Sequence, residues 1–189
     1  MTTLHLVRHG ESEWNVARRL QGQTPYVPLT PRGHRQARAT AEALRGTAAR
    51  AVYTSDLLRA RQTAEHIADV LDVPIRLRPD LRERCYGRLE GLPSADALWA
   101  AGDVDVHPGG GESLRELRQR IAAAIAGCLA DAGDGALVIV SHGDTIRAAL
   151  EWLGEPTPEI PGNGAVVSRR VAASEARHPG GQLKGVELA

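Results

Sequence analysis

Two short, mostly apolar runs, each followed by a His-Gly pair, most constrain the fold of this chain. Residues 4–7 lead through Arg8 into His9, and residues 136–140 lead into His142. Such runs are typical of strands buried in a sheet, and the glycine that follows each histidine permits a tight turn. In open α/β sheets, ligands bind where the carboxyl ends of strands meet loops. The sequence therefore predicts that Arg8 and His9 lie at a binding crevice, with an anion as the expected ligand, and that His142 repeats the arrangement.

A third strand followed by a helix strengthens this interpretation, because a single histidine after a strand is more often a loop or core residue. A strand is expected over 51–53 and a helix over 57–71, with Arg59 near the start of the helix. A cation in the first turn opposes the helix dipole, whereas an anion bound there is favoured. Arg59 therefore fits a site that binds an anion. Arg61 and Arg88 lack such a setting and are expected to be solvated surface charges.

Six blocks of sequence occur in an order that resembles the histidine phosphatase superfamily, which includes cofactor-dependent phosphoglycerate mutases and broad-specificity phosphomonoesterases. The block at 6–15 is similar to the family's signature around its nucleophilic histidine. The block at 54–64 is similar to the one that carries the second arginine, and the block at 81–91 to the one that carries the acid. The remaining blocks are 21–24 with 28–33, 110–113 and 141–143. The resemblance covers most of the chain.

The resemblance implies a nucleophilic role for His9, which would become a phosphohistidine. Arg8 and Arg59 would neutralise the nonbridging oxygens, and the fork of donors on a guanidinium suits phosphate better than an ammonium does. A neutral imidazole is a competent nucleophile when its other nitrogen keeps a proton that bonds to a fixed acceptor, for which a backbone carbonyl is expected. His142 is expected to donate to the phosphoryl group and to be kept cationic by its charge. Capping of the next helix is its alternative role.

Glu83 is the candidate general acid and base, a role that requires a raised pKa. Glu11 is a weaker candidate that could instead orient an arginine or face solvent. Asn15 is expected to donate to phosphate, with a surface helix cap as the alternative. In the family, residues similar to Arg84 and Tyr86 lie near the substrate carboxylate. The predicted substrate-binding set is completed by Gln21, Gly22 and Gly143.

The length of the segment between Gly91 and Gly110 favours hydrolysis over mutase chemistry. It has fewer than twenty residues, whereas resemblance to true mutases would require a longer, arginine-containing insertion over the site. A shorter cover leaves a phosphohistidine accessible to water. Residues 25–27 also depart from the family, which often has an acidic residue there, so the substrate entrance is expected to differ. Four residues could either line the substrate pocket or pack in the core: Leu92, Leu98, Trp99 and His107.

We therefore expect a metal-independent phosphomonoesterase that acts on a small-molecule phosphate ester. Mutase-type phosphoryl transfer, a specialised sugar or nucleoside phosphatase (an α-ribazole or bisphosphate phosphatase, for instance) and a non-catalytic binding module remain as alternatives. No metal or other cofactor is expected, because the chain has no His-Glu-x-x-His helix, paired-cysteine motif or aspartate cluster. The physiological substrate and pathway are not specified by the sequence.

Composition fits a compact enzyme rather than a nucleic-acid-binding or membrane protein. The formal net charge is zero, which gives no indication of a nucleic-acid partner. Cys85 and Cys128 are too few for a disulfide framework, and a reducing cytoplasm is the expected location. The sequence shows no signal peptide and no apolar run long enough to span a membrane. A homodimer is left open.

The alternation of expected elements predicts a three-layer α/β/α sandwich with a mostly parallel central sheet. Thr30 is the expected N-cap of a helix that has Pro31 at its first position. We expect one domain over residues 1–173 and a flexible tail over 174–189. Helices are expected over 30–45, 57–71, 113–132 and 145–153, and strands over 4–7, 51–53, 74–77, 136–140 and 165–172.

Overall fold

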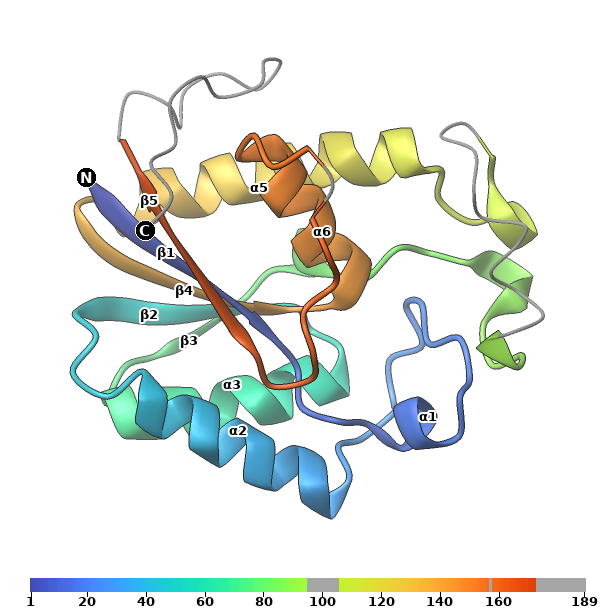
Figure 1. Ribbon diagram of the computed structural model, residues 1–189, viewed down its shortest axis with the longest axis horizontal. Coiled ribbons are helices and arrows are strands. Elements are labelled where there is room, and N and C mark those ends of the chain that lie inside the picture. Colours follow the sequence, from blue (N-terminus) through green and yellow to red (C-terminus); the bar gives the residue numbers. More distant parts are fainter. Residues whose placement is uncertain (95–105, 157, 173–189) are drawn as a thin grey trace.

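A five-stranded sheet forms the centre of the protein (Figure 1), as seen in a computed structural model that describes residues 1–94, 106–156 and 158–172. The strand order is β3-β2-β4-β1-β5, and every neighbouring pair is parallel except β1 and β5. The mostly parallel α/β sheet that the sequence predicted is confirmed, with an antiparallel strand at one edge that it did not specify. The strands are β1 (Thr2–Arg8), β2 (Ala49–Thr54), β3 (Ile75–Leu77), β4 (Gly135–Ser141) and β5 (Val166–Val171).

Helices cover both faces of this sheet (Figure 1). Helices α2 (Pro31–Ala43) and α3 (Leu58–Leu71) pack on one face, and α5 (Leu114–Ala132) and α6 (Gly143–Trp152) pack on the other. Successive residues of β4 point to opposite faces, so Leu137 and Ile139 belong to the α5/α6 core while Val138 and Val140 belong to the α2/α3 core. This double burial explains the continuous apolar run of β4.

The helix boundaries follow local capping chemistry. The Thr30 side chain accepts a hydrogen bond from the Gly33 backbone N–H, and Ser113 forms a capping box with Glu116. Helix α6 begins two residues earlier than expected, because His142 takes the N-cap position. Within the described residues, sequence periodicity did not predict the short helix α1 (Glu13–Val16) or the 3₁₀ turns η1 (Pro79–Leu81), η2 (Gly87–Leu89) and η4 (Pro108–Gly110).

The register between β1 and β4 brings the two histidines to the same edge of the sheet. Arg8 pairs with Ser141 in this parallel register, so His9 and His142 occupy the next position on each strand. The His9 backbone N–H also donates to the Ser141 carbonyl over 3.0 Å. The carboxyl ends of the central strands therefore form the rim on which the site is built.

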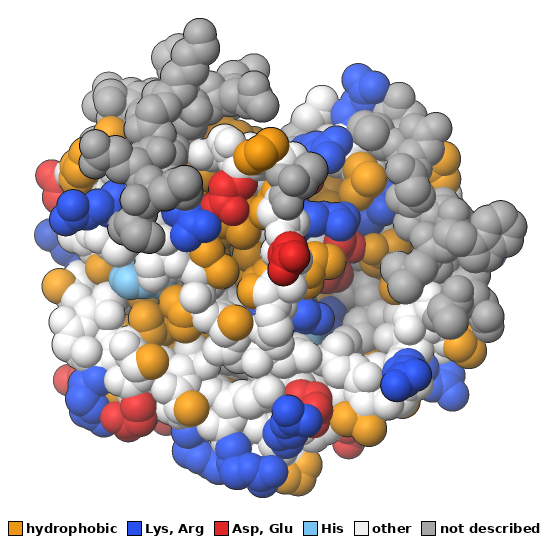
Figure 2. Space-filling view, viewed as in Figure 1, with side chains coloured by type: hydrophobic (Ala, Val, Ile, Leu, Met, Phe, Trp, Pro, Cys, Tyr) orange, Lys and Arg blue, Asp and Glu red, His pale blue; other side chains and the backbone are white. Residues whose placement is uncertain are grey.

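Surface charge, cysteines and exposed arginines can also be compared with the sequence expectations. Basic and acidic side chains are interspersed on the face shown in Figure 2, and both cysteines are free thiols. Arg61 and Arg88 are exposed, as expected. No helix in the described ranges has the length and apolar character needed to cross a membrane. The tail expected over 174–189 lies outside the described residues.

Candidate active site

His9 is held in one tautomer by its own turn. Its Nδ1 lies 2.7 Å from the Gly10 carbonyl oxygen, and because a carbonyl can only accept, Nδ1 carries the proton and Nε2 does not. The side chain is buried, with 2% of the residue exposed. Burial, followed by the positive charges of Arg59 and Arg8, holds the pKa of His9 well below its usual value. His9 therefore has a free lone pair at neutral pH.

Two guanidinium groups, one buried and one partly buried, flank this imidazole. Arg59 is fully buried and donates from Nη2 to the Gly22 carbonyl over 2.8 Å and from Nη1 to the Thr24 carbonyl over 3.0 Å. Arg8 donates from Nη1 to the Pro161 carbonyl over 2.7 Å. In the described ranges neither group pairs with a carboxylate, and the Nε atom of each is buried without a hydrogen-bond partner. Burial lowers the pKa of Arg59 to about 10, so the group stays cationic at neutral pH.

The geometry of His142 does not match the capping alternative. It occupies the N-cap position of α6, yet its side chain makes no capping hydrogen bond. Its Nε2 lies 2.9 Å from Ser55 Oγ, and its Nδ1 is buried without a partner among the described residues. Burial and the charge of Arg59 hold the pKa of His142 well below its usual value, so the ring is neutral in this state. The cationic form expected from the sequence stays a prediction for the phosphorylated enzyme.

Glu83 has the raised pKa that an acid catalyst needs. Burial is the largest cause, and the negative charge of Asp144 adds to it. The carboxylate accepts backbone N–H bonds from Arg84, Asp144 and Thr145 over 2.9–3.2 Å, of which the last two belong to the first turn of α6. Asp144 in turn accepts from the Tyr86 hydroxyl and pairs with Arg147 over 2.8 Å. Glu83 is thus fixed in orientation and favours the protonated form more than an exposed glutamate does.

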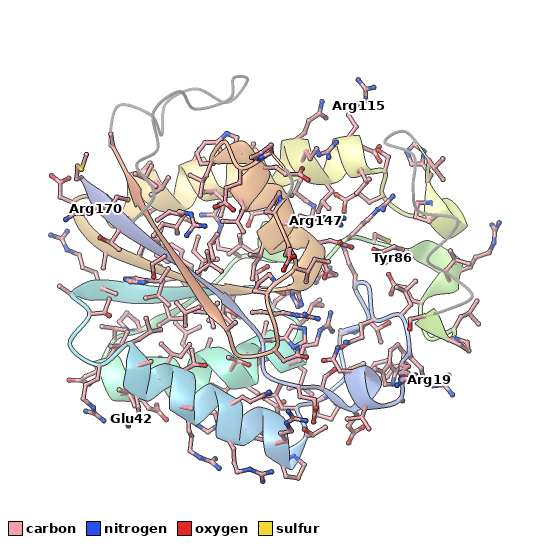
Figure 3. The ribbon with its side chains drawn as sticks, viewed as in Figure 1. Arg19, Glu42, Tyr86, Arg115, Arg147 and Arg170 are labelled. Carbon is pink, nitrogen blue, oxygen red and sulfur yellow. The ribbon has the colours of Figure 1, made fainter. Side chains whose placement is uncertain are left out.

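His9, both arginines and Glu83 border one cavity of about 420 Å³. Arg147, Tyr86 and Arg19, which belong to its wall, come from α6, the loop before η2 and the loop after α1 (Figure 3). Among the described residues of the lining, five are arginines and two carry carboxylates, so this part of the wall has a net positive charge that suits an anionic small molecule. The predicted residues that line the cavity are Arg8, His9, Gln21, Gly22, Arg59, Glu83, Arg84, Tyr86 and Gly143.

Two predicted site residues do not line the cavity. His142 is fully buried behind its wall, with its ring centroid 5.2 Å from that of His9. The carboxamide oxygen of Asn15 accepts from the Ser12 backbone N–H over 3.0 Å and from Asn163 Nδ2 over 3.2 Å. This arrangement matches the capping alternative for Asn15, because the Ser12–Asn15 capping box opens α1. Glu11 accepts from the Thr30 hydroxyl and pairs with the exposed Arg32.

Sequence reasoning missed six residues of the lining: Arg19, Leu20, Ser94, Asp144, Arg147 and Ile160. Asp144 and Arg147 had a usable signal, since they lie three positions apart on the helix that follows His142 and so share a face. Ser94 follows the isolated bridge between Arg19 and Pro93, and Ile160 comes from an irregular segment; no local pattern places either residue. Leu92 and His107 do not line the cavity, and Leu98 and Trp99 lie outside the described residues. No group of three or more potential metal ligands occurs in the described part of the chain.

Comparison with known proteins places this geometry in a family. The chain is 43% identical over 152 residues to a probable phosphoglycerate mutase GpmB of Photorhabdus laumondii, which covers 76% of this chain and 70% of the relative. It is 37% identical over 160 residues to an uncharacterized phosphatase PhoE of Bacillus subtilis, covering 85% and 81%.

Solved structures extend this likeness to the fold. A mycobacterial glucosyl-3-phosphoglycerate phosphatase superposes with a TM-score of 0.79 at 30% identity, over 89% of this chain and 90% of the other. A phosphoserine phosphatase mutant of Entamoeba histolytica in complex with phosphoserine superposes with a TM-score of 0.77 at 28% identity, over 90% and 91%. The model of the histidine phosphatase superfamily (branch 1) matches residues 4–182, and the chain belongs to that family.

Proposed function

We propose that this protein is a phosphomonoesterase that hydrolyses a small-molecule phosphate ester through a phosphohistidine on His9. The observation that carries the proposal is the buried, neutral His9, whose Nδ1 donates to the Gly10 carbonyl, beside two guanidinium groups that form no ion pair with a carboxylate in the described ranges. A phosphate monoester is an anion that repels nucleophiles, so its charge must be offset before a nitrogen can attack phosphorus. Arg8 and Arg59 supply that charge.

The first step transfers the phosphoryl group from the ester to His9. The lone pair on His9 Nε2 forms a bond to phosphorus while the bond from phosphorus to the leaving oxygen breaks. Glu83 gives its proton to that oxygen, and an alcohol is released. His142 would donate to the transferred group, whose negative charge would favour the protonated imidazole.

The second step returns the enzyme to its starting state. A water molecule attacks phosphorus, the bond between phosphorus and His9 Nε2 breaks, and the Glu83 carboxylate accepts a proton from the water. Inorganic phosphate is released and Glu83 is protonated again. This scheme assigns all charge neutralisation to side chains and includes no metal ion.

Hydrolysis is favoured over mutase chemistry by the short segment between Gly91 and Gly110, which is too short to hold the long arginine-containing cover expected of a mutase. Two of the superposed proteins are named as a glucosyl-3-phosphoglycerate phosphatase and a phosphoserine phosphatase. Both names describe phosphate esters that carry a carboxylate, so carboxylated esters are included in the test. Arg84 and Tyr86 in the wall are the residues assigned to the leaving group.

The test is a panel of phosphate esters with and without a carboxylate, scored by kcat/KM for release of inorganic phosphate. In parallel, conversion between phosphoglycerate isomers is followed with and without a bisphosphorylated primer. We expect phosphate release to dominate for at least one ester. Isomer conversion faster than phosphate release would establish a mutase instead, and no turnover of any ester, aryl phosphates included, would leave only a binding role.

A further inference from the structure

The segment that carries Glu83 is fixed by side chains from distant parts of the chain. Residues 82–86 form no helix or strand, so their backbone carbonyls need hydrogen-bond partners other than those of regular secondary structure. Thr145 Oγ1 donates to the Arg82 carbonyl over 2.9 Å, and Gln23 Nε2 donates to the Glu83 carbonyl over 3.0 Å. The position of the Glu83 carboxyl group therefore depends on residues outside its own segment.

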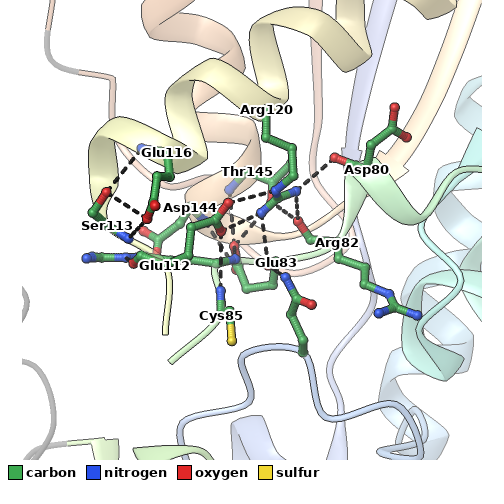
Figure 4. Close-up of polar contacts among 12 residues, drawn as sticks. Asp80, Arg82, Glu83, Cys85, Glu112, Ser113, Glu116, Arg120, Asp144 and Thr145 are labelled. Carbon is green, nitrogen blue, oxygen red and sulfur yellow. Dashed lines mark hydrogen bonds and ion pairs between the residues drawn. The ribbon is translucent and has the colours of Figure 1, made fainter. Parts of the chain in front are cut away.

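Arg120, on α5, contacts this segment and also the turn that precedes it (Figure 4). Its Nη1 donates to the carbonyls of Asp80 and Arg82 over 2.8 Å and 2.9 Å, and its Nη2 lies 3.3 Å from the Glu83 carbonyl. One planar guanidinium thus spans three carbonyls before and at Glu83. A lysine ammonium has three donors on a single atom and does not match this spread.

Glu112 completes the arrangement from the other side. Arg120 donates to it through Nε over 2.8 Å and through Nη2 over 2.6 Å, a two-bond ion pair that orients the guanidinium plane. The Glu112 backbone N–H donates to the Cys85 carbonyl over 2.7 Å, and its carbonyl accepts from Arg84 Nε over 2.8 Å. The pair therefore holds the backbone on both sides of Glu83.

We propose that Arg120 is a positioning residue that holds the carboxyl group of Glu83 where it can give its proton to the leaving oxygen. Arg120 does not line the cavity, so it acts through the Glu83 backbone rather than on the substrate. The inference rests on the proposed function, in which Glu83 is the general acid.

The experiment compares kcat/KM for an alkyl phosphate, which needs proton donation to its leaving oxygen, with kcat/KM for an aryl phosphate, which needs less. The variants are Arg120→Gln and Arg120→Lys, and the control is Arg118→Gln. Arg118 lies on the same helix and pairs with Glu151 over 2.6 Å, away from the Glu83 segment. Because both substrates are measured on the same preparation, their ratio does not depend on the fraction of enzyme that is folded.

We expect Arg120→Gln to lower the alkyl-to-aryl ratio by roughly tenfold to a hundredfold, the size of effect that a misplaced catalytic group produces. Arg120→Lys keeps the charge and should also lower the ratio, whereas Arg118→Gln should leave it unchanged. If the Gln variant does not fold, the Lys variant decides. An unchanged ratio in a folded Arg120 variant overturns the inference, provided that Glu83→Gln lowers it; a parent enzyme that releases no phosphate would overturn the proposed function instead.

Discussion

The imidazole rings of His9 and His142 lie with their centroids 5.2 Å apart and their planes inclined at 59°. They follow neighbouring parallel strands, and each is neutral because burial and nearby arginines disfavour the protonated form. The two rings nevertheless differ in their hydrogen bonds: Nδ1 of His9 bonds to its own turn, while Nδ1 of His142 is buried without a partner in the described ranges. This difference supports the proposed roles, in which His9 attacks phosphorus and His142 donates to the phosphoryl group.

The nucleophile assignment predicts a covalent adduct on His9. After brief mixing with substrate and denaturation without acid, mass spectrometry should find a phosphoryl group on the peptide that contains His9. His9→Ala should abolish both the adduct and turnover. His34→Ala is the control, since His34 lies on α2 and contacts His66, and it should keep both. An adduct on another residue, or normal turnover by His9→Ala, would show that the assignment is wrong.

The acid role of Glu83 predicts a loss that depends on the leaving group. Glu83→Gln keeps the size of the side chain but cannot give up a proton, so kcat/KM for an alkyl phosphate should fall by roughly 10²–10⁴. The first transfer from an aryl phosphate should be much less affected, while hydrolysis of the phosphohistidine slows. Stopped-flow assays should therefore show a burst of aryl product followed by slow turnover.

Glu90→Gln is the comparison for that experiment, because both Glu90 oxygens already bind the loop at 23–24, to the Gln23 N–H and the Thr24 hydroxyl. It should not show the same dependence on leaving group. Equal losses of Glu83→Gln on both substrates, without a burst, would mean that Glu83 holds the loop or binds substrate. Glu11 and Glu90 would then be tested as the acid.

Gly22 should be needed for the orientation of Arg59. It has φ +47°, and a Cβ there would lie 2.2 Å from Glu90 Oε1. Gly22→Ala must therefore move either the loop, whose carbonyls bind Arg59, or the Glu90 side chain, which bonds to that loop. We expect kcat/KM to fall about tenfold or more for alkyl and aryl phosphates alike. Gly46→Ala is the matched control, with φ +81° and no heavy atom within 4 Å of the added Cβ.

The Gly46→Ala control separates the effect of backbone strain from the effect of a steric clash with Glu90. Gly46→Ala should lower the free energy of unfolding by about 1–2 kcal/mol, the cost of a left-handed alanine, while kcat/KM stays at the parent value. Parent kinetics in Gly22→Ala would show that the loop tolerates the added methyl group without moving Arg59.

Stability should depend on pH through His142. Its pKa in the folded chain lies well below 6.5, so below that pH the unfolded chain binds a proton that the folded chain does not. The free energy of unfolding therefore falls as pH falls from 6.5, by up to about 1.4 kcal/mol per pH unit for this group. Glu83 has the opposite sign because its pKa is raised, so variants must be compared with the parent.

Urea unfolding of the parent and of His142→Gln, near pH 7.5 and near pH 5.5, measures this linkage. Between the two conditions the variant should lose about 1 kcal/mol less than the parent. Equal losses would indicate that His142 takes up a proton in the folded chain over the same pH range as in the unfolded chain.

Activity should survive removal of divalent metal ions. Arg8 and Arg59 carry the charge neutralisation in the proposed scheme, so dialysis against EDTA should leave kcat/KM for an aryl phosphate unchanged. A parallel assay with added Mg²⁺ or Zn²⁺ serves as the control. Loss of activity on EDTA treatment that a divalent ion restores would move the function toward a metallophosphatase.

The sequence could predict those parts of the fold that depend on neighbours along the chain. Thr30 and Pro31 define the start of α2, and the apolar run of β4 matches a strand with both faces buried. The antiparallel direction of β5 was not predictable in this way, because it is set by pairing with β1 across more than 150 residues. Helix α1 was missed since four residues are too few for a periodic pattern.

The site divides along the same line. His9, His142 and Arg59 were recognisable because each follows a strand directly or opens the next helix. The sequence did not indicate a role for Arg120, because this side chain donates to backbone carbonyls about 40 residues earlier in the chain. Every residue has such a carbonyl, so no sequence pattern marks the partners. The packing of α5 against the Glu83 segment determines which polar side chain donates to these carbonyls.

Because β1 and β4 carry the two histidines, the rate of catalysis should depend strongly on the register between these strands. Seven residue pairs, from Thr2 with Gly135 to Arg8 with Ser141, fix the position of one histidine against the other. A slip by a single pair would move one ring by about 3.3 Å along the strand and turn every side chain of the slipped strand to the opposite face. Substitutions that disturb the packing of Leu6 against Ile139 should therefore abolish turnover while the helices and most backbone hydrogen bonds persist. Enzyme activity would be lost before the fold is lost.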